Sequence, residues 1–218
     1  MDWGAFLLSL KLAVTTTVLL IPLAVLLVRP LARWRSPAKS VLEALLALPL
    51  VLPPTVLGYY LLVGFGRVSP LGRVFEAAFG TPLVFSFTGL VAASLIANIP
   101  FAVQPIQRAC EALPRDITDA AWVSGLTRGA AFWRIELPLI SSGVLSAAVL
   151  TFAHTMGEFG VVLMVGGNIP GVTRTAAIAL YDATQVPGGA AGGLAAALLA
   201  VSFLAIVAVQ LLSRRPVR

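Results

Sequence analysis

The chain has 218 residues, of which 59% are hydrophobic and only 11% are charged, and its mean hydropathy is +0.97. A water-soluble domain of this length needs more polar surface, so the composition excludes a soluble protein and indicates an integral membrane protein. The formal net charge of +6 lies in short segments between apolar runs. That placement is typical of membrane-orientation signals and disfavours a nucleic-acid partner. The single cysteine, Cys110, excludes an intrachain disulfide.

Five apolar segments are long enough to cross a bilayer, and they predict an all-α membrane protein with about five transmembrane helices in one domain, residues 1–218. Their approximate ranges are 6–28, 40–65, 83–106, 139–165 and 192–212. The first segment alone, about 23 residues at 1.5 Å each, reaches roughly 34 Å, which is enough to cross the hydrocarbon layer.

Two of these spans contain helix-breaking residues. Pro49, Pro53 and Pro54 predict that the second span is bent or locally unwound, because proline removes a backbone donor and clashes with the preceding turn. The run Asn98-Ile99-Pro100 predicts a kink in the third span. Between the spans we expect a short interfacial helix over 71–79 and a short re-entrant or surface helix over 175–183.

The basic residues outside the spans indicate the orientation. Most of them fall in the loop that follows Arg29, in the segment 108–138 and at the C-terminus, whereas only Arg67, Arg73 and Arg174 lie on the opposite side. Because cytoplasmic loops are enriched in Lys and Arg, this asymmetry predicts the N-terminus outside and the C-terminus inside.

The polar segment 108–138 carries the most specific pattern of the chain. From Asp119 it reads D-A-A-W-V-S-G-L-T-R-G-A-A-F-W-R-I-E-L-P. The small residues Ala120, Ala121 and Gly125 permit close approach to another surface. Four further side chains are too apolar for a free loop: Trp122, Leu126, Phe132 and Trp133. We therefore expect a short helix docked in a groove of a soluble partner. The alternative is an amphipathic helix that lies on the lipid surface.

The spacing of this run resembles the cytoplasmic coupling loop of ABC importer permeases, which reads E-A-A, three residues, Gly, nine residues, I-x-L-P. Asp119 stands in place of the usual glutamate. The resemblance implies the type I ABC importer permease fold and contact between this loop and a partner ATPase. The residues that it assigns to this contact are Asp119, Ala120, Ala121, Gly125, Leu126 and Arg128.

Ionisable side chains inside the spans are candidates for a functional role, because burying charge in a membrane is costly. His154 and Glu158 are four residues apart in the fourth span, so we expect them to share a helix face. Lys11 lies near the outer end of the first span, at a depth that allows a structural ion pair with Glu158. The alternative for Lys11 is that its side chain extends to the outer surface.

Further runs resemble the permeases of molybdate ABC importers. They are L-P-L-V-L-P-P-T-V-L-G-Y-Y-L-L at 48–62, G-E-F-G at 157–160 and G-N-I-P-G-V-T-R-T at 167–175. His154 stands where that family has an arginine. Sulfate and thiosulfate permeases share G-E-F-G and the coupling pattern, so they remain the alternative.

The molybdate family implies a multi-pass protein of the bacterial inner membrane that imports molybdate or tungstate. It also implies a homodimer of permeases, two cytoplasmic ATPase subunits that bind ATP and Mg²⁺, and an extracytoplasmic substrate-binding protein. In that assembly this chain binds no cofactor or metal of its own. ATP hydrolysis belongs to the partner, since the chain has no nucleotide-binding motif and no catalytic constellation.

The loop after the fourth span is suited to a tetrahedral oxyanion, because Asn168, Thr173 and Arg174 offer hydrogen-bond donors. Together with His154 and Glu158 they are our candidates for the translocation path or its gate. The alternative is that the loop docks the binding protein or packs on the helices. The rival function for the whole chain is a channel or ion-coupled carrier, which the odd number of spans disfavours.

Overall fold

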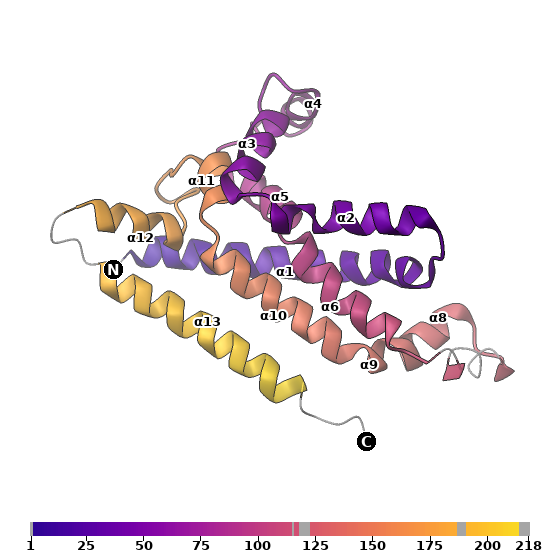
Figure 1. The fold of residues 1–218 in the computed structure, drawn as a ribbon. Coiled ribbons are helices and arrows are strands. Elements are labelled where there is room, and N and C mark those ends of the chain that lie inside the picture. Colours follow the sequence, from indigo (N-terminus) through magenta and orange to yellow (C-terminus); the bar gives the residue numbers. More distant parts are fainter. Residues whose placement is uncertain (1, 115, 118–122, 187–190, 214–218) are drawn as a thin grey trace.

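The computed structural model describes residues 2–114, 116–117, 123–186 and 191–213, and this part of the chain is helical without any strand. Two of its helices are each long and apolar enough to cross a membrane, and the number rises to five if each of three bent helix pairs in the described residues forms one span. The predicted all-helical membrane fold is thereby confirmed (Figure 1).

Helix α1 (Trp3–Arg33) packs against α6 (Ile99–Glu111) and α10 (Ser141–Gly157), and the contacts among these three helices form the centre of the bundle. Its first turn is capped by Asp2, whose carboxylate accepts a hydrogen bond from the Ala5 amide at 3.0 Å. The three helices meet at small buried side chains: Ala24, Ala102 and Ala147. Small residues let helix backbones approach closely, which is how helices associate in a membrane.

The second and third spans are bent, as predicted. Helices α2 (Pro37–Val51) and α3 (Pro54–Phe65) meet at 108°, where Pro53 and Pro54 interrupt the helical hydrogen bonds. Helices α5 (Phe87–Ala97) and α6 meet at 41° around Asn98, whose side-chain amide donates to the Ser94 carbonyl at 2.8 Å.

The fourth span is broken, which corrects the expectation that His154 and Glu158 share a helix face. Helix α10 ends at Gly157, Glu158 adopts an extended conformation, and α11 begins at Gly160 and runs to Gly166. Packing explains the glycine at position 160, because a Cβ there would lie only 2.7 Å from the Pro54 Cβ on α3. The chain leaves the helix at Gly157 so that α11 can pack closely on α3.

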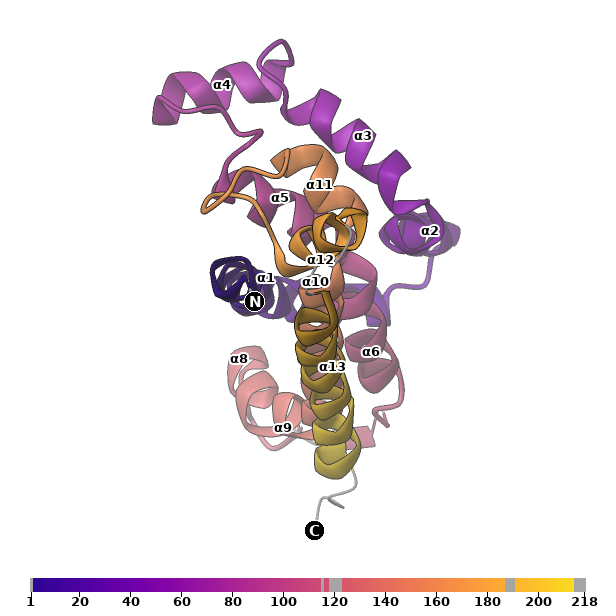
Figure 2. The same cartoon turned by 90° about the vertical axis from the view of Figure 1, so that its left-hand side faces the viewer.

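The remaining helices lie around this centre. Helix α4 (Pro70–Phe79) extends away from the bundle, and α12 (Ala176–Gln185) lies near the N-terminus (Figure 2). They occupy the two stretches where the sequence predicts short helices. Helix α13 (Ala191–Ser213) packs along α10 on one side only and leaves its outer face open.

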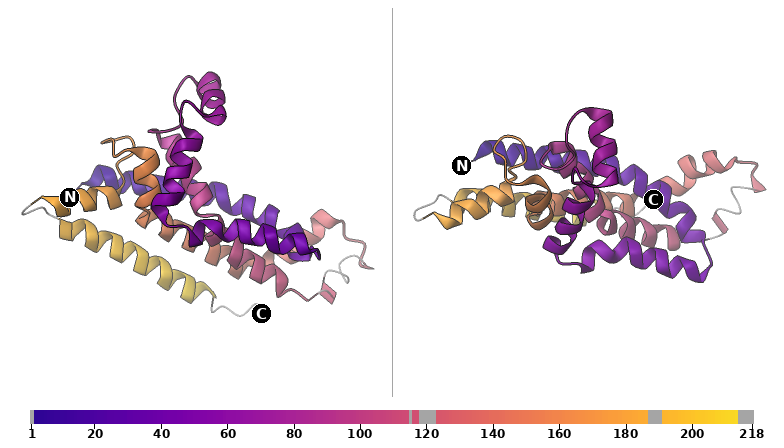
Figure 3. Two further views of the ribbon diagram at one scale, coloured as in Figure 1. Left: turned by 45° about the horizontal axis from the view of Figure 1, so that its top comes forward. Right: turned by 90° about the horizontal axis from the view of Figure 1, so that it is seen from above.

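The predicted coupling loop, 108–138, is described in its second part, and residues 123–139 are called the coupling segment below. This segment contains three short helical pieces: α8 (Arg128–Ala131), a π-helix, η1 (Phe132–Glu136), and α9 (Leu137–Leu139). Figure 3 places these pieces at the same end of the bundle as the connection between α1 and α2. The N-terminus and α12 lie at the other end. The basic residues between Arg29 and Lys39 and the coupling segment therefore share one side of the molecule. Arg29 and Arg33, expected in a loop after the first span, belong to the end of α1.

Candidate coupling and translocation site

The coupling residues that the structure describes lie at the exposed tip of the bundle. Gly125 has a φ of +76°, a conformation that favours glycine, and a Cβ there would meet nothing within 4 Å. Leu126 is half-buried and Arg128 is exposed. Asp119, Ala120 and Ala121 lie outside the described residues.

Large apolar side chains are exposed on this segment. Val123 is 90% exposed and Trp133 is 68% exposed, although both belong to the polar end of the bundle. Exposed aromatic and aliphatic groups beside a polar rim are typical of a protein–protein contact.

An ion-pair cluster connects the coupling segment to α1. Arg29 donates from Nε to Glu136 Oε2 at 2.9 Å, and Arg33 donates from Nη2 to Glu136 Oε1 at 2.7 Å. Arg29 also donates to the Arg128 carbonyl at 3.0 Å, and its guanidinium lies 4.7 Å from the centre of the Phe132 ring. Two pieces of the coupling segment, α8 and η1, are thus bound to the same side chain of α1.

The Glu136 carboxylate is the buried member of this cluster, with 7% of its side chain exposed. Burial by itself would raise the pKa of Glu136, but the hydrogen bonds from Arg29 and Arg33 outweigh it and lower the pKa below its ordinary value. Sequence reasoning missed this contact because Glu136 occupies the variable position of I-x-L-P. The sequence feature that indicates this contact is a single acidic residue within a short apolar run, in a chain whose first connecting segment is rich in arginine.

The π-helix places Glu136 where the two arginines reach it. Its wide turn is closed by the Leu137 amide, which bonds the Phe132 carbonyl. Single π-turns inside helices are frequent at functional sites because the extra residue redirects the side chains that follow. Here the turn directs Phe132 and Glu136 inward, where both are buried, and leaves Trp133 exposed.

His154 is hydrogen-bonded inside the bundle. Its Nδ1 lies 3.0 Å from Asn98 Oδ1, and its ring stacks on Phe101 with centroids 4.1 Å apart. Because the Asn98 amide nitrogen already donates to Ser94, Oδ1 is left to accept, which makes His154 Nδ1 the donor. The histidine therefore joins α10 to the bend between α5 and α6.

Lys11 and Glu158 are not joined in the structure. The Lys11 ammonium lies 4.4 Å from the centre of the Phe87 ring, and no salt bridge between described residues includes either Lys11 or Glu158. Glu158 is 7% exposed, and its Oε2 has no hydrogen-bond partner in the described part of the chain. The lysine extends to the surface and contacts an aromatic face, which is the alternative that the sequence leaves open.

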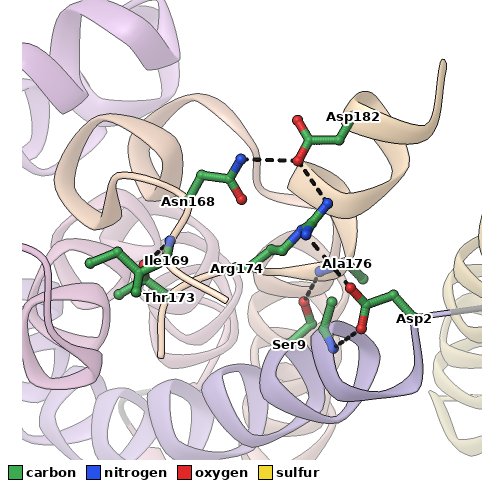
Figure 4. A network of polar contacts seen from close by, with 9 residues as sticks. Asp2, Ser9, Asn168, Ile169, Thr173, Arg174, Ala176 and Asp182 are labelled. Carbon is green, nitrogen blue, oxygen red and sulfur yellow. Dashed lines mark hydrogen bonds and ion pairs between the residues drawn. The ribbon is translucent and has the colours of Figure 1, made fainter. Parts of the chain in front are cut away.

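In the loop after the fourth span, the polar side chains form hydrogen bonds and ion pairs with other residues of this chain (Figure 4). Arg174 pairs with Asp182 at 2.8 Å and with Asp2 at 3.9 Å, and Asn168 donates to the same Asp182 carboxylate at 2.9 Å. Thr173 is fully buried and donates to the Gly166 carbonyl at 2.7 Å. These contacts tie the loop to α12 and to the start of α1. Arg174 Nε is buried without a hydrogen-bond partner among the described residues, whereas Arg174 Nη2 and the Asn168 amide donate to Asp182.

The predicted site residues therefore form separate groups. The described coupling residues gather at one end, His154 lies in the middle beside Asn98, and the outer-loop residues surround Asp182 near the N-terminus. Among the described residues, no three His, Cys, Asp or Glu side chains are placed to hold a metal ion.

Comparison with known proteins gives the family. Residues 12–218 match the model of the family described as "binding-protein-dependent transport system inner membrane component". The molybdenum transport system permease protein ModB of Azotobacter vinelandii is 44% identical over 208 residues, covering 95% of this chain and 92% of that protein. ModB of Escherichia coli K12 is 38% identical over 211 residues, covering 97% and 91% of the two chains. The sulfate permease CysT of Synechocystis is 31% identical, covering 84% of this chain and 64% of that protein.

Solved structures give the same fold. A bacterial ABC transporter involved in the import of alginate has a chain with a TM-score of 0.73 at 16% identity, covering 99% of this chain and 79% of that chain. The family description and the apolar helices establish a multi-pass protein of the bacterial inner membrane. This chain belongs to the family of binding-protein-dependent transport system inner membrane components, the permease subunits of ABC importers.

Proposed function

We propose that this chain is the membrane permease of an importer for molybdate, or for the closely similar tungstate. The observation that carries the proposal is the match of 95–97% of the chain to molybdenum transport permeases at 38–44% identity. The sulfate permease is less similar and is matched over a smaller part of its length. Sulfate or thiosulfate transport is therefore the alternative that an uptake experiment must test.

The proposed assembly contains two copies of this chain, two cytoplasmic ATPase subunits and an extracytoplasmic binding protein. Three features support it. Val123 and Trp133 expose apolar surface where the ATPase would bind, α13 leaves one face open, and a structural neighbour is described in complex with a substrate-bound periplasmic protein. ATP and Mg²⁺ would be bound and hydrolysed by the ATPase subunits, and this chain would bind no cofactor.

The proposed orientation places the N-terminus outside and the C-terminus inside. It is supported by the asymmetric distribution of basic residues and by the arrangement of the bundle, where the basic residues between Arg29 and Lys39 and the coupling segment share one end. In that orientation the coupling segment faces the cytoplasm, where ATPase subunits are found.

In the proposed mechanism the ATPases move the coupling segment, and the contacts around Glu136 pass that movement to α1. Helices transmit it because each is rigid along its length, while the breaks at Pro53, Asn98 and Glu158 allow one helix to rotate against the next. The result is alternating access to the two sides of the membrane, without any chemical step in this chain.

ATP-driven uptake into proteoliposomes tests the function. The permease is reconstituted with its ATPase and binding protein, and molybdate, tungstate and sulfate are supplied in turn. We expect uptake of molybdate and tungstate that needs all three components and that sulfate does not inhibit. Preferential uptake of sulfate would support the alternative, and transport by this chain alone would indicate a channel or carrier.

A further inference from the structure

A groove runs along the face that α6 and α10 share. Its volume is about 490 Å³, and the side chains that line it include Phe101, Gln104 and Arg108 from α6 and Ser142, Ser146 and Leu150 from α10. Figure 1 shows the two helices side by side, with α10 extending beyond the start of α6.

The lining residues follow helical spacing. On α10 the lining residues Ser142, Ser146 and Leu150 are four residues apart. His154, which does not itself line the groove, follows at the same spacing, so the four side chains form one stripe along the helix. From Ser142 to His154 this stripe extends roughly 18 Å along the axis. The groove is therefore a continuous track, polar at the end near the coupling segment and apolar further into the membrane.

Three hydrogen-bond donors in this track are unused. Arg108 is exposed, and its guanidinium takes part in no side-chain hydrogen bond or ion pair with a described residue. The Gln104 amide and the Ser142 hydroxyl likewise have no side-chain hydrogen bond to a described residue. A helix face turned toward lipid would leave these groups unsatisfied at high cost, so this face borders water or a polar occupant.

A neighbouring hollow of about 410 Å³ also borders Arg108. The charged residues that line the groove and this hollow indicate which of the two suits an anion. That hollow is lined by Glu43 and Glu111, and Lys39 is already paired with both at 3.5 and 2.8 Å. The groove between α6 and α10 contains Arg108 and no carboxylate. An anion is therefore favoured in the groove and disfavoured in its neighbour.

At the end farther from the coupling segment the track meets an aromatic stack. Phe101 lines the groove and stacks on His154, whose ring is held by Asn98 at the bend between α5 and α6. A change in that 41° bend would move Asn98, the histidine and the phenylalanine together. The stack thus occupies the place where a gate would separate the groove from the outer half of the membrane.

We propose that this groove is the cytoplasmic leg of the oxyanion path, with Arg108, Gln104 and Ser142 as its anion contacts and the Phe101–His154 stack as its gate. The inference rests on the proposed function and extends it to named residues. A guanidinium can bind two oxygens of a tetrahedral oxyanion at once, which is the geometry that molybdate or tungstate presents.

The first test compares two variants of Arg108 in the complete transporter reconstituted in proteoliposomes. Arg108→Gln should lower molybdate uptake about tenfold, because a charge-assisted hydrogen bond is lost. Arg108→Lys should keep most of the uptake, and ATPase activity stimulated by the binding protein should stay unchanged in both. Arg35→Gln, which removes an exposed cation outside the groove, is the control and should transport normally.

Three results separate the explanations. Unchanged uptake by Arg108→Gln beside active wild type would overturn the path. Equal losses of uptake and ATPase activity would also overturn it, because they would assign a structural role to Arg108. Wild-type transporter that carries no molybdate would refute the proposed function itself, which is a different outcome.

Cysteine labelling provides a second test, in a Cys110→Ser background. A negatively charged thiol reagent should label Ser142→Cys, and molybdate during ATP turnover should slow that labelling. Ser40→Cys, exposed on α2 outside the groove, should be labelled at a rate that molybdate does not change. A disulfide between two copies of Ser142→Cys, without labelling, would make the groove an interface between copies and would overturn the proposal.

Discussion

Replacing Glu136 by glutamine tests how the coupling segment is held on α1. The substitution removes the charge and one acceptor from a carboxylate that receives hydrogen bonds from Arg29 and Arg33. A hydrogen bond to a charged group contributes about 1.5–3 kcal/mol, and the exposure of the two arginines, 30% and 47%, reduces that contribution. We estimate a loss of about 2 kcal/mol, which is roughly a 30-fold shift toward the undocked segment.

Hydrogen exchange and transport measure this effect together. In Glu136→Gln, amides of the coupling segment should exchange faster, while those of α10 beyond its first turn should not change. Molybdate imported per ATP hydrolysed should fall, because the segment moves without moving α1. Arg33→Gln should have a smaller effect, since Arg29 remains bound. Arg35→Gln is the control, because Arg35 forms no ion pair with a described residue. Normal exchange and a normal transport ratio in Glu136→Gln would refute the reasoning.

Three further predictions follow from other residues. Gly125→Val should abolish coupled uptake while membrane insertion survives. At the φ of +76° found at this position a β-branched residue loses about 1–2 kcal/mol of conformational stability, and its side chain enlarges the docking surface. Normal insertion together with normal uptake would contradict this prediction. The lowered pKa of Glu136 implies that its contribution to stability is complete above about pH 4.3 and lost as the pH falls through the lower folded-state value. Thermal unfolding in detergent should show this acid loss in wild type and not in Glu136→Gln. Arg174→Gln should reduce stability by about 1 kcal/mol, since the pair with Asp182 is partly exposed, and should retain uptake; abolished uptake would instead assign the loop to the substrate path.

The bends of the second and third spans were predictable because their cause is local. Proline at 53 and 54 removes donors wherever it occurs, and Asn98 before Ile99-Pro100 ends a helix by the same chemistry. The break in the fourth span was not predictable in this way. Gly157 and Gly160 are compatible with a continuous helix, and the close approach of Gly160 to Pro54 depends on how distant helices pack.

The candidate site likewise has features that a local sequence pattern predicts and features that depend on contacts between distant segments. The coupling pattern is a feature of one short segment, so its spacing can be read directly. The contacts of Glu136 and His154 connect residues 107 and 56 positions apart in the chain, and they depend on helix packing that no local pattern encodes. In the sequence Arg29 and Arg33 indicate only the orientation, whereas in the structure they also bind Glu136 of the coupling segment.

Photo-cross-linking from position 133 tests the central claim most directly, that the coupling segment binds a cytoplasmic ATPase. Trp133 is 68% exposed at the tip of the bundle, so a photoreactive residue in its place should reach a bound partner. In assembled transporter we predict an adduct with the ATPase chain, accessible only from the cytoplasmic face. An adduct with lipid alone, or labelling from the outer face of sealed vesicles, would contradict the account.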